Sequence, residues 1–147
     1  MSHTNRYTAY SDYKHSGFEW LGGIPASWIV APLKYVTLAK SDAIKTGPFG
    51  SQLLSSEMQG HEVKVYNQRN VIDRDLVKGD EYISMEKYEA LRSFTVFPRD
   101  ILITTRGTIG RCVIVPENAE LGILHPCLMR IQPHSKKILT EYLILLP

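Results

Sequence analysis

The sequence predicts a folded domain that combines short β-strands with a few helices, and three patterns carry this prediction. Two apolar, β-branched runs, Ile101–Thr104 and residues 112–115, flank a short polar loop, which is typical of strand, turn and strand. Val63–Tyr66 alternates apolar and polar side chains, as a strand does. Residues 85–92 place apolar side chains three residues apart behind Ser84, a good capping residue, which predicts a helix of about two turns.

The composition is that of one folded domain. The chain has 147 residues, of which 44% are hydrophobic and 22% charged, so it can bury a core and is not a disordered chain. Its formal net charge is only +2, so a nucleic-acid partner is allowed but not demanded. Cys112 and Cys127 have no metal-binding spacing, and no apolar run resembles a signal peptide or a membrane span. We therefore expect a cytoplasmic protein with reduced thiols and no membrane partner.

Along the chain, the pattern divides into an arm, a body and a final helix. Residues 1–23 are polar and aromatic and predict an irregular arm packed on the body. Residues 24–134 form the body, in which residues 26–30 predict a strand start and Trp28 a core anchor. Residues 137–146 predict a helix that is apolar almost all round, within a terminal segment 135–147. Since this helix has barely begun at Pro147, we expect a truncated spacer-type helix that can also pair two copies of the chain.

Two loops carry side chains that can contact DNA. Residues 44–53 contain two glycines and a proline, which predicts a shaped loop, with donors at Lys45, Ser51 and Gln52. Phe49 at its tip is expected to fold onto the core; the alternative is that it stacks on a base or wedges into the duplex. Residues 105–111 hold Arg106 and Arg111 beside glycines and threonines, and can grip a polyanion or form an ordinary solvated turn.

The strand at Val63–Tyr66 runs into a third polar segment, residues 67–70. It holds two asparagines, a glutamine and an arginine in succession. Asparagine and glutamine pair with adenine, and arginine with guanine, through two hydrogen bonds each. Capping of an ordinary turn is the alternative.

Few enzymatic chemistries fit the sequence. It has no glycine-rich nucleotide loop, no histidine spacing for a metal and no nucleophile with a base, so we predict no catalytic residue, metal or cofactor. Asp42, Glu62 and Lys64 resemble the carboxylate–carboxylate–lysine set of magnesium nucleases, which stays an alternative. A protein-interaction domain with merely solvated basic loops is the other alternative.

Three motifs carry a family resemblance that spans nearly the whole chain. The first is the lead-in YKHSGFEWLGGIPASW at residues 13–28, and the second is GPFGS at residues 47–51. The third is FPRDILI at residues 97–103, followed by RGTIGR at residues 106–111. Together they resemble the target-recognition domain of the specificity subunit of type I restriction–modification systems.

The resemblance implies a non-catalytic module that binds double-stranded DNA. The implied fold is α+β, a curved, mostly antiparallel β-sheet with a few helices. In the family, a full specificity subunit has two such domains, and each reads one half of a split target. Long helices between them dock the methyltransferase (M) subunits, and through these the restriction (R) subunit. This chain holds one such domain and only the start of a helix.

The resemblance also divides the candidate residues into two groups. The hairpin loop recurs among domains that read different sequences, so it does not distinguish targets, and base readout belongs to the variable residues 54–94. The residues predicted to contact bases are Lys64, Tyr66, Asn67, Gln68, Arg69 and Asn70. The residues predicted to contact the DNA backbone are Lys45, Ser51, Gln52, Arg106 and Arg111.

Overall fold

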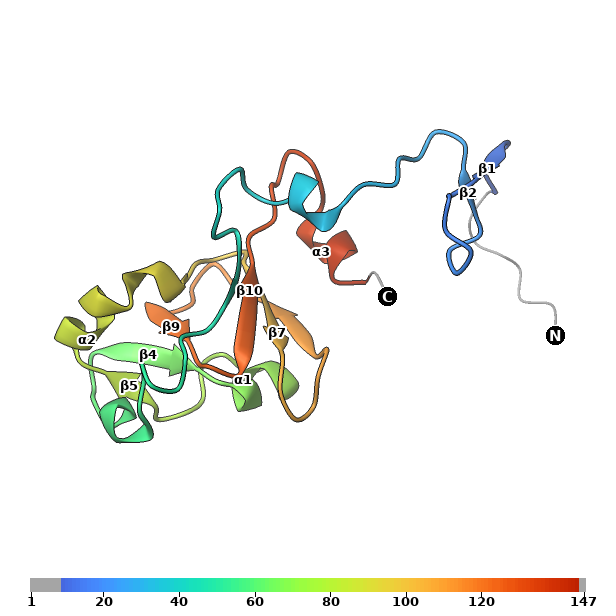
Figure 1. The fold of residues 1–147 in the computed structure, drawn as a ribbon. Helices are drawn as coiled ribbons and strands as arrows, with labels where there is room; N and C mark the ends of the chain where they lie inside the picture. The colour runs from blue at the N-terminus through green and yellow to red at the C-terminus, as the bar shows by residue number, and fades with distance from the viewer. Residues whose placement is uncertain (1–8, 146–147) are drawn as a thin grey trace. The chain divides into compact units, whose positions relative to one another are not determined.

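The computed structural model describes residues 9–145 and divides the chain into two compact units, Met1–Pro32 and Leu33–Pro147 (Figure 1). Within the described residues the fold is α+β, with three α-helices and mostly antiparallel strands, and no sheet closes on itself. This confirms the predicted fold class at that level. Among the same residues, no helix has the length and apolar character that crossing a bilayer requires.

The first unit contains a two-stranded antiparallel hairpin of β1 (Tyr13–His15) and β2 (Gly23–Pro25). The predicted boundary at residue 23 therefore falls inside a strand, and residues 1–8 of the predicted arm lie outside the described residues. The prediction of a strand at residues 26–30 is wrong. The chain turns there instead, and the Trp28 N–H donates to the Pro25 carbonyl at 2.9 Å. Trp28 is not a core anchor but is 41% exposed, and its ring meets Tyr10 edge to face.

The strands of the second unit form two four-stranded sheets instead of the single curved sheet that was expected. The first sheet, all antiparallel, has the order β3 (Ile44–Thr46), β10 (Leu128–Ile131), β7 (Ile101–Thr104) and β8 (Cys112–Ile114). The second has the order β5 (Tyr82–Ile83), β4 (Val63–Tyr66), β9 (Gly122–Leu124) and β6 (Thr95–Val96), and only β4 and β9 are parallel. The break falls at residues 125–127, where the chain leaves β9 and enters β10.

A shared apolar core joins the two sheets. Tyr66 and Leu124 from the second sheet cluster with Leu102 and Leu128 from the first, and all four are fully buried. Burying large apolar side chains from both sheets in one cluster is the main stabilising term of such a layered fold. Because β4 and β9 sit in this core, their side chains are buried on both faces, as in a central strand.

The helices are short. α2 (Met85–Ala90) confirms the predicted helix, and the Ser84 hydroxyl caps it by accepting from the Lys87 N–H at 3.1 Å. α1 (Gln68–Ile72) begins in the polar segment 67–70, where no helix was predicted. α3 (Thr140–Leu143) lies inside the predicted 137–146 helix, whose last residue is outside the described part. Single 3₁₀ turns occur at η1 (Leu33–Tyr35), η2 (Ser55–Met58) and η3 (Arg92–Phe94).

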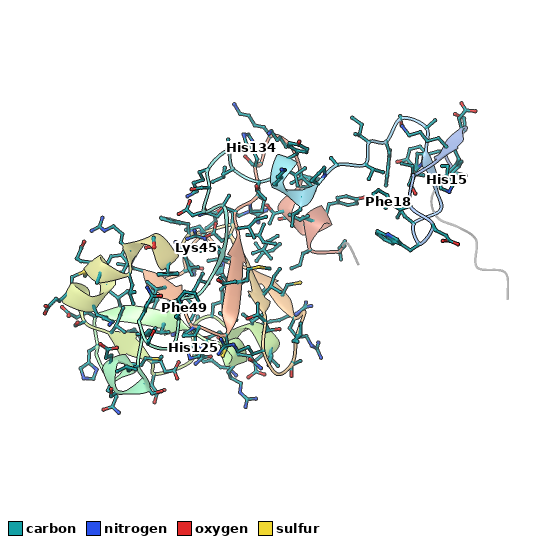
Figure 2. All side chains as sticks on the ribbon, in the orientation of Figure 1. His15, Phe18, Lys45, Phe49, His125 and His134 are labelled. Atoms are coloured by element: carbon teal, nitrogen blue, oxygen red, sulfur yellow. The ribbon has the colours of Figure 1, made fainter. Side chains whose placement is uncertain are left out.

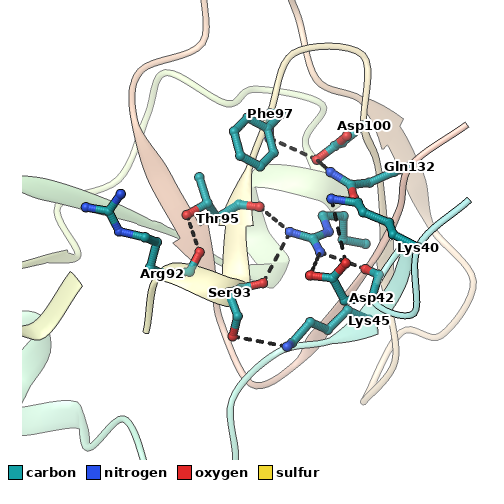
Figure 3. A network of polar contacts seen from close by, with 10 residues as sticks. Lys40, Asp42, Lys45, Arg92, Ser93, Thr95, Phe97, Asp100 and Gln132 are labelled. Carbon is teal, nitrogen blue, oxygen red and sulfur yellow. Dashed lines mark hydrogen bonds and ion pairs between the residues drawn. The ribbon is translucent and has the colours of Figure 1, made fainter. Parts of the chain in front are cut away.

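A buried arginine links the two sheets through polar contacts (Figure 3). Arg130 on β10 is only 1% exposed. Its guanidinium donates to the carbonyls of Asp42 at 2.8 Å and Ser93 at 3.5 Å, and to that of Thr95. The Asp42 carboxylate lies 3.6 Å away. One side chain thus ties β10 to the segments that lead into β3 and β6.

Asp100 lies in the same network and is 4% exposed. Its Oδ2 accepts from the Phe97 N–H at 2.9 Å and from the Gln132 amide at 3.5 Å. Burial raises the pKa of Asp100 to about 6, although the Phe97 N–H and the charge of Arg130 act in the opposite direction. The folded protein therefore holds this proton to a higher pH than the unfolded chain does.

This difference in proton binding predicts a pH dependence of stability. The ordinary pKa of Asp100 is 3.8, so between pH 3.8 and about 6 the folded state binds more protons than the unfolded state. The contribution of Asp100 to the free energy of unfolding therefore falls as pH rises through this window. Asp100→Asn has no carboxyl group that titrates at this position. The difference in free energy of unfolding, variant minus wild type, should therefore rise from pH 4 to pH 6, because only the wild-type protein loses this contribution; urea titrations measure it. Parallel curves for the two proteins would contradict this.

Candidate nucleic-acid interface

The connection between β9 and β10, residues 125–127, lies where separate polar segments meet. The His125 N–H donates to the carbonyl of Tyr66 at 2.9 Å, at the end of β4 where α1 is about to begin. Thr105 donates both its N–H and its hydroxyl to the Cys127 carbonyl, each at 3.0 Å. These contacts bring the start of α1 and the hairpin loop 105–111 to the same end of the second unit.

The loop of residues 47–52 joins the same place. The Gly47 N–H donates to the carbonyl of Leu128 at 2.8 Å, at the beginning of β10. A Cβ atom at Gly47 would lie 2.1 Å from the His125 carbonyl oxygen, so only glycine allows the two backbones to approach this closely. Three segments that are distant in sequence therefore converge on His125 and its neighbours.

Phe49 lies two residues beyond Gly47 in this loop, and Figure 2 labels it close to His125. It is 77% exposed, so the expectation that it folds onto the core is wrong. The reason is local: the Phe49 N–H donates to the Gln52 side chain at 2.9 Å, and the Gln52 N–H donates back to the Phe49 carbonyl at 2.8 Å. Pro48 and Leu53 occupy the buried positions of the loop instead.

Asn67 and Asn70 cap α1 reciprocally. The Asn67 side chain accepts from the Asn70 N–H at 3.3 Å, and the Asn70 side chain accepts from the Asn67 N–H at 3.0 Å. Asn67 also donates to the Glu81 carboxylate at 2.9 Å. This capping fixes Gln68 and Arg69 in the first turn of the helix.

The first turn of α1 and the hairpin loop form one recess of about 550 Å³. The Gln68 amide lies against Gly107 in that loop, which has a φ of 65°. The recess is lined by residues from both segments and by two residues that the sequence did not single out, Glu81 and His125. The full lining is Asn67, Gln68, Arg69, Ile72, Glu81, Thr108 and His125. Glu81 and His125 also line an adjoining recess of about 610 Å³.

The charge around the recess is mixed, because Arg69 and Glu81 line it and Arg106 lies near His125. Arg69, Arg106 and Arg111 are exposed. Burial lowers the pKa of His125, and the nearby Arg106 adds to this, while Glu81 opposes it. His125 is therefore neutral at pH 7, and its Nδ1 accepts from the Cys127 N–H at 3.1 Å, which leaves Nε2 as the protonated nitrogen.

Two of the residues predicted to contact bases are buried in β4, which corrects that prediction. Lys64 is 1% exposed, and its Nζ donates to the Val77 carbonyl at 3.1 Å and lies 3.4 Å from the Glu120 carboxylate. Tyr66 is fully buried, and its hydroxyl donates to the Glu120 carbonyl at 2.6 Å. Burial and the charge of Glu120 raise the pKa of Tyr66 to about 12. Both side chains hold the second sheet together and do not reach the surface.

Asn70 and Lys45 also make contacts within the chain. Asn70 is 1% exposed and donates to the carbonyls of Asp75 at 2.9 Å and Lys78 at 2.8 Å, so it closes the loop after α1 and is not free for a base. Lys45, predicted to contact a phosphate, donates to the Ser93 hydroxyl at 3.1 Å and lies over the ring of Phe94. Ser51 is exposed, and Gln52 is exposed but holds the Phe49 backbone.

The three residues of the nuclease alternative have separate partners. The Glu62 carboxylate accepts from the Met85 N–H at 2.7 Å, and Asp42 pairs with Arg130 and with Lys40, each at 3.6 Å. Lys64 is buried against Glu120, as described above. Within residues 9–145, no three His, Cys, Asp or Glu side chains are grouped so that they could hold a metal ion. The set is not assembled in this structure.

Sequence reasoning missed His125 and Glu81 as parts of the recess. The one signal for His125 is that His125-Pro126 interrupts an apolar run, which marks the point where the chain changes sheets. Glu81 carries no local signal, because its place in the recess depends on the contact between segments. No family model matches the chain, and no curated protein matches it either.

Proposed function

We propose that the chain is a sequence-specific DNA-binding module, the target-recognition domain of a type I restriction–modification specificity subunit. One observation supports the proposal most directly: two segments that the sequence singled out line one recess. Gln68 and Arg69 come from the segment predicted to contact bases, and Thr108 comes from the family-like hairpin motif. The motifs at residues 13–28, 47–51 and 97–111 point to the same family. The module would bind DNA without cutting or methylating it.

The recess suits the reading of base edges. Gln68 can pair with adenine and Arg69 with guanine, and both start from a capped turn that fixes their direction. Asn67 is committed to Glu81 and to the helix cap, so it supports the two readers and does not read a base itself. Exposed donors at Arg106, Arg111 and Ser51 would contact phosphates and fix the register on the duplex.

The proposed role includes partners in a larger complex. One module reads one half of a split target, and a second recognition domain would read the other half. A helix continuing from α3 would set the spacing and dock the methyltransferase subunit, which in turn recruits the restriction subunit. A single half-site reader should bind weakly, because affinity gained by linking two sites is absent.

A selection experiment tests the proposal directly. A random duplex pool is bound at low and at physiological salt, and the retained fraction is sequenced. We expect enrichment of a short motif of a few base pairs and an affinity that falls steeply with salt, since phosphate contacts release counterions. Failure to bind any duplex at low salt would overturn the proposed function.

Arg69→Ala gives a sharper test on the enriched duplex. Loss of one base contact should weaken binding to that duplex by about 1–3 kcal/mol and relax the preference at one position, while binding to unrelated duplex changes little. Arg92→Ala is the matched control, because Arg92 is an exposed arginine paired with Glu89 and is no part of the recess. Fluorescence anisotropy measures both. Equal losses on the two duplexes would place Arg69 on a phosphate instead.

A further inference from the structure

Phe49 is a large aromatic side chain that the fold holds in water. It is 77% exposed at the tip of the loop 47–52. Both backbone polar groups of Phe49 are engaged: its N–H donates to Gln52 Oε1, and its carbonyl accepts from the N–H groups of Gln52 at 2.8 Å and Leu53 at 3.3 Å. Leu53 is 2% exposed and anchors the loop in the core. The exposure of Phe49 is therefore fixed by a braced loop.

The loop stands beside the recess. Gly47, two residues before Phe49, packs its Cα against the carbonyl of His125, and His125 lines the recess. The hairpin loop, on another side of the recess, carries a second exposed apolar side chain, Ile109, which is 73% exposed and follows Thr108 directly. Each of these two loops therefore carries an exposed apolar side chain, Phe49 or Ile109, beside a residue of the recess or of its surroundings.

We infer that Phe49 inserts between neighbouring base pairs of the bound duplex while the recess contacts base edges, an inference that rests on the proposed function. A base offers an apolar π-face for the ring and a polar edge for Gln68 and Arg69, so one ligand satisfies both parts of the surface. Apolar wedges of this kind partly unstack a base step and bend the duplex. A protein partner would favour apolar surroundings for Phe49, whereas the neighbouring recess is lined mostly by polar side chains.

The experiment compares three variants on a duplex enriched by the wild-type protein. 2-Aminopurine is placed at each position in turn, since its fluorescence reports unstacking, and dyes at the duplex ends report bending by energy transfer. Phe49→Ala removes the apolar wedge, Phe49→Trp keeps an aromatic ring, and Leu139→Ala removes a comparably exposed apolar side chain, 71% exposed, near α3. Leu139 is a fair control because it follows the far end of β10, whereas Gly47 contacts the beginning of that strand.

We expect wild type, Phe49→Trp and Leu139→Ala to raise 2-aminopurine fluorescence at one step and to bend the duplex. Phe49→Ala should lose both signals and bind about 10-fold more weakly. Because Phe49 is exposed, unchanged melting temperatures should show that all variants fold. If wild type binds its motif but Phe49→Ala keeps the affinity and both signals, the inference is wrong and the proposed function stands. If wild type binds no duplex, the proposed function itself is wrong.

Discussion

Replacing Arg130 by methionine should lower the free energy of unfolding by about 3–5 kcal/mol, a large part of the stability of a small domain. Methionine keeps most of the buried stem but donates no hydrogen bond. The carbonyls of Ser93 and Thr95 and the backbone carbonyl of Asp42 would lose their charged donor. An unpaired buried polar group retains its full desolvation cost, which sets the size of the effect. Urea denaturation followed by circular dichroism measures it.

Two further variants separate this effect from simple loss of charge. Arg92→Met removes an arginine that pairs with Glu89 at the surface, where solvent screens the pair, so its stability should stay close to wild type. Asp42→Asn removes a carboxylate but keeps the carbonyl that Arg130 contacts at 2.8 Å, so it should lose much less stability than Arg130→Met. A stable Arg130→Met would show that the buried network is dispensable.

The elements with strong local signals were predictable. The alternation in Val63–Tyr66, the β-branched run Ile101–Thr104 and the capped helix after Ser84 match β4, β7 and α2, because hydrophobic period and capping act within a few residues. α1 was not predicted, because four polar residues in succession show no apolar period that would indicate a helix. The reciprocal cap between Asn67 and Asn70 makes the same residues start a helix.

The burial of β4 and the division into two sheets depend on contacts between distant residues. The alternation of Val63–Tyr66 predicts one exposed face, yet Lys64 is covered by the segment around Val77 and by Glu120. In the sequence, Arg130 is a single polar residue within an apolar run, as on the exposed face of a strand. Nothing near it indicates that it contacts residues 42, 93 and 95. Such packing overrides local pattern.

Some of the residues named from the sequence meet in the structure. Gln68 and Arg69 line the recess, and Arg106 lies close enough to His125 to lower its pKa. The recess itself could not be predicted, because it depends on the meeting of α1 and the hairpin loop at residues 125–127. The sequence therefore singles out segments that meet in the structure better than it predicts which of their side chains are exposed.

Gly47→Ala should lower the free energy of unfolding by about 3 kcal/mol, at the upper end for a single added methyl group. Its Cβ would lie 2.1 Å from the carbonyl oxygen and 2.7 Å from the carbonyl carbon of His125. Both are backbone atoms, so no side-chain rotation relieves the clash, and the loop 47–52 or the β9–β10 connection must move. The shift in urea midpoint measures the cost.

Gly50→Ala is the matched control, three residues along the same loop. A Cβ at Gly50 meets nothing within 4 Å, so this variant should be as stable as wild type or slightly more stable, because alanine makes the unfolded chain less flexible.

The pair Gly47→Ala and Gly50→Ala also tests whether the loop 47–52 and α1 are both held by the connection at His125. If the loop 47–52 and α1 depend on the same connection, Gly47→Ala should speed amide hydrogen exchange in α1 as well as in the loop, while Gly50→Ala leaves both unchanged. Exchange that rises in the loop alone would mean that each segment is held independently, and the recess would then be less rigid than its contacts indicate.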